Sequence, residues 1–111
     1  MRIILKLPKN LADALGTERL TVEKELIVRV LYEKLREINE KLREAERESK
    51  RFRNKYGMTF EEFEAKIKNG EFLDPQHHED YVEWSFWESI KKKMERAKRE
   101  LLNAIRAINS G

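Results

Sequence analysis

The sequence has no cysteine, only two prolines and four glycines, and no long uncharged stretch. Without cysteine there is no disulfide framework, no thiol nucleophile and no zinc site built on thiolates. The glycines are widely separated, which excludes a Gly-rich phosphate-binding loop. Uncharged runs such as residues 101–105 are only a few residues long, whereas a membrane-spanning helix needs roughly 20 apolar residues. We therefore expect no transmembrane helix and a soluble, cytoplasmic protein.

Charged residues make up 41% of the chain, and their signs are unevenly distributed. Residues 1–57 hold 15 basic and 10 acidic side chains, residues 58–90 hold 2 and 9, and residues 91–111 hold 7 and 2. Two interpretations stay open: charge compensation across a folded hairpin, or separate acidic and basic partner surfaces. Lys, Glu and Arg dominate while Gln76 is the only glutamine, a balance common in thermophile proteins.

The first residues predict a strand and a short helix. The alternating pattern of residues 2–7 places Ile3, Leu5 and Leu7 on one face of a strand and Arg2, Ile4 and Lys6 on the other. Pro8 ends this strand and opens a helix over residues 9–15, which Gly16 closes. We assign residues 1–20 to this N-terminal strand and helix, a dimerisation or DNA-reading part, and residues 21–111 to a helical hairpin.

Two long seams of apolar residues, spaced alternately by three and four, predict the hairpin. The first helix starts after Thr21, and its seam is Val28, Leu31, Leu35, Ile38, Leu42, Ala45, Ser49, Phe52 and Tyr56. The second helix covers residues 79–108, and its seam is Glu83, Trp87, Ile90, Met94, Ala97, Leu101, Ala104 and Ile108. The expected class is mainly α: a short N-terminal β-strand and helix, then an antiparallel two-helix coiled-coil hairpin.

A short connecting helix is predicted between the two long ones. Gly57 ends the first helix, and Thr59 with Glu62 forms a capping box. The connecting helix then covers residues 60–69, and residues 71–78 form a loop. Leu26, Ile27, Tyr32, Leu102 and Ile105 lie off the seams and need other cover, so we expect a homodimer.

No part of the sequence predicts a catalytic site or a metal site. His77, His78, Glu79 and Asp80 could in principle hold a metal, but adjacent residues do not point at one centre. A polar loop that complements a helix N-terminus explains them better. We predict no catalytic residue, no cofactor and no metal, and a function in binding.

The most unusual segment holds both tryptophans among acidic residues. Its aromatic side chains cover more than one face of a helix. One interpretation is a docking site for a basic partner, made by Tyr81, Glu83, Trp84, Phe86 and Trp87. The other is that the connecting helix and a second subunit bury all of the aromatic residues.

Two basic clusters lie on the predicted long helices, one at residues 43–55 and one at residues 91–99. An antiparallel hairpin brings them near each other, where Lys92 and its neighbours could follow a phosphate backbone. Solvated helix faces give the same pattern, so both interpretations stay open.

Two stretches are similar to known proteins. Residues 1–16, followed by residues 22–26 and 31–32, resemble the start of small prokaryotic type II antitoxins: a strand, a helix ending in Ala-Leu-Gly, then an acidic-aliphatic helix. Residues 55–64 and 79–84 resemble small archaeal and bacterial proteins often paired with a small toxin. Together these stretches cover about a third of the chain.

The resemblance implies an antitoxin-like protein that neutralises a small protein toxin, with operator DNA as a further candidate partner. The strand would dimerise and read DNA through Arg2, Ile4 and Lys6, and the segment from Tyr81 to Trp87 would contact the toxin. That function requires Trp84, Phe86 and Tyr81 to be at least partly exposed. The alternative is a helical-hairpin scaffold or adaptor with no nucleic-acid role, and a nucleic-acid binder without a toxin is the third hypothesis.

Overall fold

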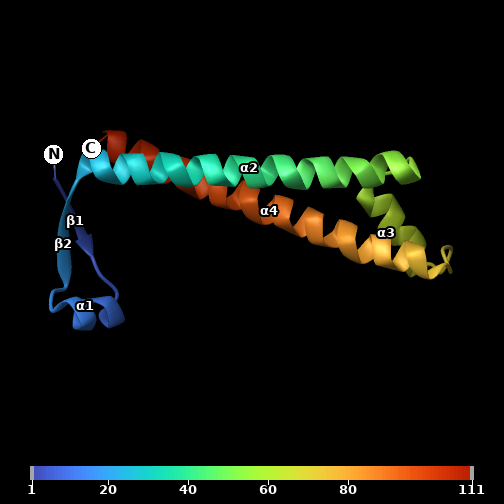
Figure 1. Cartoon of the computed structure of the whole chain (residues 1–111), viewed down its shortest axis with the longest axis horizontal. Helices are drawn as coiled ribbons and strands as arrows, with labels where there is room; N and C mark the ends of the chain where they lie inside the picture. Colours follow the sequence, from blue (N-terminus) through green and yellow to red (C-terminus); the bar gives the residue numbers. More distant parts are fainter. Residues whose placement is uncertain (1, 111) are drawn as a thin grey trace. The chain divides into compact units, whose positions relative to one another are not determined.

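The computed structural model describes residues 2–110, without the side chain of Leu20. In chain order the elements are β1 (Arg2–Lys6), α1 (Lys9–Leu15), β2 (Arg19–Glu23), α2 (Lys24–Tyr56), α3 (Phe60–Lys68) and α4 (Pro75–Ser110) (Figure 1). The long helices α2 and α4 pack against each other, so the predicted helical hairpin with a short connecting helix is confirmed. No helix within residues 2–110 carries an apolar stretch long enough to cross a membrane.

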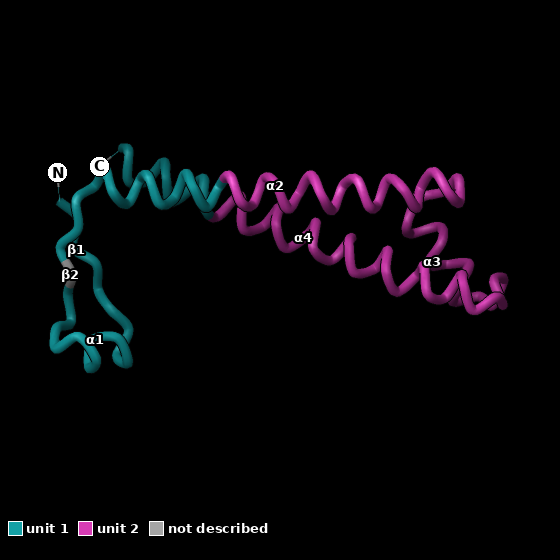
Figure 2. Tube along the Cα trace, viewed as in Figure 1, with its two compact units in different colours: residues 1–35, 101–111 teal, residues 36–100 magenta. Residues whose placement is uncertain are grey.

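The chain divides into two compact units (Figure 2). Unit 1 contains residues 1–35 and 101–111, and unit 2 contains residues 36–100. Each is described by itself below.

Unit 1 contains a β-hairpin. β1 pairs antiparallel with β2, so that Arg2 lies opposite Glu23, Ile4 opposite Thr21 and Lys6 opposite Arg19. The predicted strand and its two faces are confirmed. The prediction that a helix starts after Thr21 was wrong, because residues 19–23 form a second strand and α2 starts at Lys24.

The signal for β2 was present in the sequence. Thr21 and Val22 are β-branched and therefore favour a strand over a helix. The predicted boundary at residue 20 falls inside this strand. Since β1 pairs with β2 of its own chain, one edge of β1 is already occupied.

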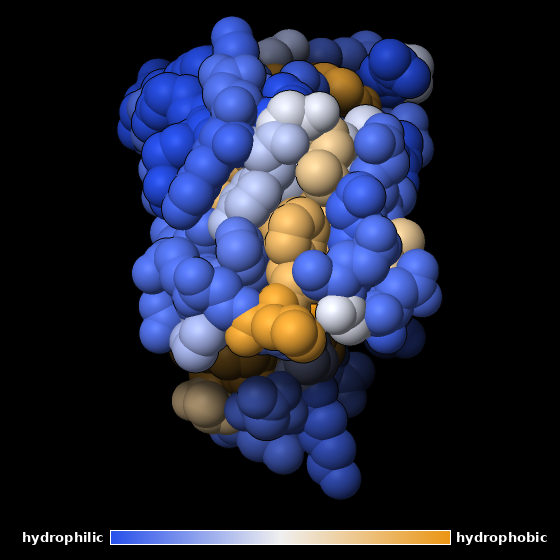
Figure 3. Space-filling model, turned by 90° about the vertical axis from the view of Figure 1, so that its right-hand side faces the viewer, coloured by the Kyte–Doolittle hydropathy of each residue, from blue (hydrophilic) through white to orange (hydrophobic). Residues whose placement is uncertain are grey.

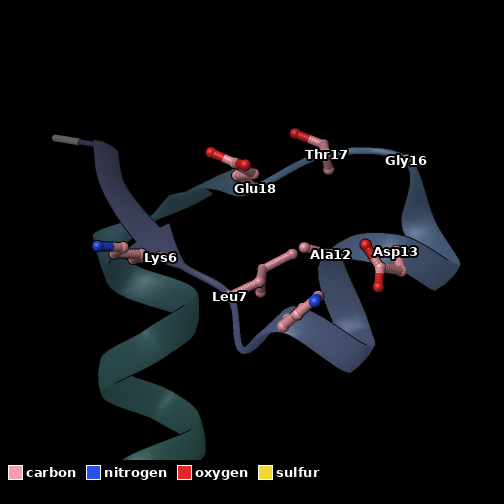
Figure 4. A pocket seen from close by; sticks show the side chains of 8 residues that line it. Lys6, Leu7, Ala12, Asp13, Gly16, Thr17 and Glu18 are labelled. Atoms are coloured by element: carbon pink, nitrogen blue, oxygen red, sulfur yellow. The ribbon is translucent and has the colours of Figure 1, made fainter.

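α1 spans the predicted residues, and Gly16 ends it in the left-handed conformation at φ 70°. None of its residues is buried. The Leu7 side chain extends toward Ala12 of α1 and closes one side of a hollow (Figure 4). α1 is therefore held by few apolar contacts.

The core of unit 2 follows the predicted seam of α2. Ile38, Ala45, Ser49 and Phe52 are buried and Leu42 is half-buried, which together follow the predicted spacing of three and four residues. The seam of α4 was placed wrongly at its start, where Glu83 is exposed and Trp84 is completely buried. Toward the end of α4, in unit 1, Ile105 is buried and Ala104 is exposed. In both places the larger apolar side chain occupies the interior in place of the predicted seam residue.

The connecting helix α3 begins after Thr59, as predicted, but the Glu62 carboxylate bonds to the Thr59 hydroxyl where a capping box has the Thr59 N–H. Thr59 Oγ1 accepts a hydrogen bond from the Glu62 N–H at 3.2 Å and donates to Glu62 Oε1 at 3.2 Å. Met58 and Phe63, before and after the cap, both contact the core of unit 2. Capping and burial together fix where α3 starts.

α4 begins earlier than predicted. Residues 71–78 were expected to form a loop, but the helix starts at Pro75. Proline is favoured at the first helical position because it has no N–H to leave unpaired. Asp74 supports this start, since its Oδ1 accepts the Gln76 N–H at 2.9 Å. His77 and His78 therefore lie in the first turn of α4.

Candidate functional site

An aromatic cluster fills the end of unit 2 where α2, α3 and α4 meet. Its buried members are Phe52, Phe63, Ile67 and Trp84, with Tyr56, Met58, Phe60, Phe72, Tyr81 and Trp87 packed against them. The Trp84 ring stacks on Phe52 at 5.6 Å and lies 5.4 Å from Phe63, measured between ring centroids. Edge-to-face and offset ring pairs of this kind add to the stability gained by burial.

Trp84 was predicted to contact a partner, and this placement was wrong. Its exposed fraction is 0%. The ring is enclosed because α3 folds back across it, with Phe60 meeting it edge-on at 5.4 Å. Its Nε1 has no hydrogen-bond partner within the described residues. The largest side chain of the predicted docking segment is therefore part of the protein's own core.

Asp80 is the one buried carboxylate of this region among the described residues, with an exposed fraction of 4%. It accepts hydrogen bonds from Lys55 Nζ at 2.6 Å, from Gln76 Nε2 at 3.0 Å and from the Tyr56 hydroxyl. Burial alone opposes ionisation of Asp80, but these three donors outweigh it and hold the pKa of Asp80 below its ordinary value. Burial and the Asp80 carboxylate raise the pKa of Tyr56 in turn. This network joins the end of α2 to the start of α4.

His77 takes part in packing. Its ring lies 4.7 Å from Phe72 and 5.8 Å from Tyr56, and its buried Nδ1 has no partner within residues 2–110. His78 on the next position is exposed. Within the described residues, no three histidine or carboxylate side chains lie close enough together to share a metal ion.

The outer face of α4 exposes apolar residues one turn apart. Val82 is 68% exposed and Phe86 is 52% exposed, four positions apart on the same face. Phe86 meets Trp87 edge-on at 5.0 Å, and Trp87 is only partly exposed. Exposed Glu83 lies beside them and pairs with Arg51 of α2 at 3.2 Å. Two apolar side chains next to Glu83 therefore remain accessible on this face.

Tyr81 lies between this face and α3. Its hydroxyl donates to Glu64 Oε2 at 2.7 Å, and this hydrogen bond, with burial, raises the pKa of Tyr81. Its ring stacks on Phe60 at 6.0 Å. A shallow groove of mixed polarity lies nearby between α3 and α4, lined by Phe60, Glu64, Ser85, Glu88, Ser89, Lys92 and Lys93. Tyr81 thus shapes the surface but offers little of itself to a partner.

Hydrophobic residues also reach the surface at the turn end of the hairpin. Figure 3 shows a strip of hydrophobic residues between hydrophilic ones, seen from the side where α3 lies in Figure 1. Leu73, in the loop between α3 and α4, has an exposed fraction of 84%. A single exposed leucine is common on protein surfaces and needs no partner to explain it.

The basic clusters of α2 and α4 are partly neutralised. Arg53 pairs with Glu46 at 2.8 Å, and Lys91 pairs with the same carboxylate at 3.0 Å. These two hydrogen bonds lower the pKa of Glu46, and the bond to Glu46 raises the pKa of Lys91. Lys92 is exposed and lines the groove between α3 and α4. Some basic residues of unit 2 therefore form ion pairs within the hairpin, and these pairs interrupt a continuous basic surface.

The predicted DNA-reading face of β1 is exposed. Ile4 is 64% exposed, Lys6 is exposed, and Arg2 Nε pairs with Glu23 Oε1 at 2.9 Å. Arg19 lies opposite Lys6 on β2 and extends the basic surface, which the sequence prediction missed together with the strand.

Unit 1 also has an open apolar groove that the sequence did not locate. Its lining is entirely apolar and joins both strands to the first turns of α2: Leu5, Val22, Leu26, Ile27, Val30 and Leu31. Leu26 is 52% exposed and Val30 is 59% exposed. Of the residues expected to need cover, Ile105 is buried, whereas Leu26 and Tyr32 are not.

Comparison with known proteins places the chain in a family. The model of the Uncharacterized protein MJ0235 family matches residues 6–106. No curated protein and no solved structure matches the chain. The chain therefore belongs to the MJ0235 family, and that match covers most of both units.

Proposed function

We propose that the chain is a non-catalytic binding protein, a helical-hairpin adaptor that contacts a protein partner through the outer face of α4. The observation that carries the proposal is the exposure of Val82 and Phe86 on one face, next to exposed Glu83. Aromatic residues contribute strongly to binding when a partner covers them. Glu83 favours a partner with a basic group that can share its carboxylate with Arg51.

The burial of Trp84 favours the adaptor function over toxin neutralisation. Toxin neutralisation was expected to use Trp84, Phe86 and Tyr81 together, but Trp84 is inside the core and Tyr81 is tied to Glu64. The remaining contact surface is Phe86 with Val82, Glu83 and the exposed edge of Trp87. A small toxin is one partner that this surface could take, and the adaptor function does not depend on it.

DNA binding is a second candidate function, supported by one observation. Arg2, Ile4 and Lys6 share an exposed face of β1, with Arg19 beside Lys6. Basic and apolar side chains on a β-ribbon can enter a DNA groove. Such binding would weaken steeply as salt concentration rises.

The test is capture of partners by the tagged full-length chain from an extract of its own cells, with and without nuclease. The Phe86→Ser variant should lose a stoichiometric, nuclease-resistant protein partner. Leu73→Ser is the matched control, because it removes an even more exposed apolar residue of unit 2. Equal capture of the partner by both variants would overturn the proposal that α4 is the binding surface. Loss of the captured material on nuclease treatment would favour the DNA-binding function.

The same experiment separates an adaptor from an antitoxin. The captured protein is expressed alone and then together with this chain. Growth arrest that this chain relieves identifies toxin neutralisation, whereas unchanged growth supports an adaptor.

A further inference from the structure

In unit 1, the outer edge of β2 is unpaired within the described chain, and an open apolar groove lies beside it. The sheet of the described chain has two strands in the order β1-β2, so β2 has no strand on its other side. Two-stranded sheets are at best marginally stable in water, and open edges tend to pair with another strand. The groove of Leu5, Val22, Leu26, Ile27, Val30 and Leu31 lies on the face that carries Leu5 and Val22.

We propose that a second copy of this chain pairs antiparallel along β2, centred on Thr21, and so forms a four-stranded sheet. The pairing joins the apolar grooves of the two copies on one face of that sheet. This inference does not depend on the proposed function of α4, because it concerns a different unit.

The charge pattern of β2 is self-complementary in this register. Antiparallel pairing about Thr21 places Arg19 of each copy opposite Glu23 of the other, and Thr21 opposite Thr21. Opposite charges and paired threonines directly across a ladder stabilise it. The exposed edge of β1 lacks this property, since pairing about Ile4 would place Arg2 opposite Lys6 twice. Like charges directly opposite each other destabilise a ladder.

The same pairing would correct a charge conflict inside each copy. Lys6 lies opposite Arg19 in the β1-β2 ladder, so two positive charges are neighbours. Glu23 lies opposite Arg2 at the other end. In the four-stranded sheet Glu23 of the second copy would stand beside Arg19, and each such row would then run Lys6, Arg19, Glu23, Arg2.

The backbone of β2 offers the groups that pairing needs. The Leu7 N–H donates to the Glu18 carbonyl at 2.9 Å, which fixes the alternation of the ladder. The backbone N–H and C=O groups of residues 18, 20 and 22 therefore point toward β1, and those of residues 19, 21 and 23 point toward the open edge. Thr17 Oγ1 occupies the outward groups of Arg19, donating to its carbonyl at 2.8 Å and accepting its N–H at 3.3 Å. A pairing strand replaces this exposed hydroxyl and bonds the outward-facing N–H and carbonyl of Thr21.

The test measures the association of full-length chains by sedimentation equilibrium. Wild type should dimerise. Arg19→Glu and Glu23→Arg should each weaken the dimer by roughly 10- to 100-fold, because each places like charges opposite each other twice. A 1:1 mixture of the two variants should form a heterodimer close to wild-type affinity, since both contacts then join opposite charges. Circular dichroism checks that each variant is folded.

The mixture is the decisive arm, because a variant that merely misfolded could not be rescued by another variant. Thr21→Pro, which removes the outward N–H at the centre of the pairing, should abolish both homodimer and heterodimer. Monomeric wild type, single variants that dimerise as wild type does, or a mixture that stays monomeric would each overturn the proposal.

Discussion

The two units of the chain use their apolar residues in opposite ways. In unit 2, α3 folds over the hairpin, and Phe52, Phe63 and Trp84 are completely buried. In unit 1, Ile105 is the only apolar side chain buried among the described residues, while Leu26 and Val30 stay more than half exposed. Unit 2 therefore has a core of its own, whereas unit 1 leaves much of its apolar surface exposed.

The difference shows what a third element does for a helical hairpin. Two helices alone bury one stripe each, which leaves their remaining apolar residues in water. α3 covers the aromatic residues of unit 2 and so provides a second layer. The β-hairpin of unit 1 provides too few residues for the same task, and a second copy of the chain could supply the missing cover. Four substitutions, taken in order of expected effect, test this contrast.

Trp84→Ala should have the largest effect. Removing a fully buried tryptophan leaves a cavity among Phe52, Tyr56 and Phe63, and costs about 3–5 kcal/mol of unfolding free energy. Urea unfolding followed by circular dichroism measures it. A loss below about 1 kcal/mol would mean that unit 2 does not hold the core described above.

Asp80→Asn should cost about 2 kcal/mol near neutral pH, because three hydrogen bonds to a buried carboxylate are weakened or lost. The pKa of Asp80 is lowered in the folded state, so its contribution is complete above the unfolded pKa of about 4. It is lost as pH falls through the still lower folded pKa. Unfolding measured over this acidic range should show a flatter pH dependence for Asp80→Asn than for wild type.

Thr59→Ala should cost about 1 kcal/mol, the usual effect of removing an N-cap side chain. The loss tests whether the start of α3 stabilises unit 2 as a whole. Amide hydrogen exchange should show faster exchange at Glu62, whose N–H loses its acceptor. Unchanged exchange there would mean that packing of Phe63 alone fixes the helix start.

Much of the fold could be predicted from sequence because periodicity records burial directly. The seam of α2, the cap at Thr59 and the end of α1 at Gly16 each depend on residues close in sequence. The strand β2 was missed because its residues pair with residues of β1 that lie 13 to 21 positions earlier in the chain. Thr21 also permits a helix N-cap, which the local sequence cannot distinguish from a strand.

The candidate site was harder to predict for a related reason. Whether Trp84 faces water depends on α3, which no pattern within α4 can reveal. The sequence located the exposed Phe86 and the buried Trp84 on neighbouring parts of one helix but could not rank their exposure. The groove in unit 1 combines both strands with α2, so it emerges only after the strands have paired.

Leu26→Ser should have the smallest effect on an isolated chain, below about 0.5 kcal/mol, because Leu26 is half exposed. If a second copy covers the groove, the effect must grow with protein concentration, since association stabilises only the folded state. Thermal unfolding of wild type and Leu26→Ser at low and high concentration measures this. Tyr32→Ser is the matched control, because Tyr32 is equally exposed on α2 but does not line the groove. A concentration-independent difference for Leu26→Ser would show that the exposed apolar residues of unit 1 are ordinary surface, and the contrast between the units would then concern only their cores.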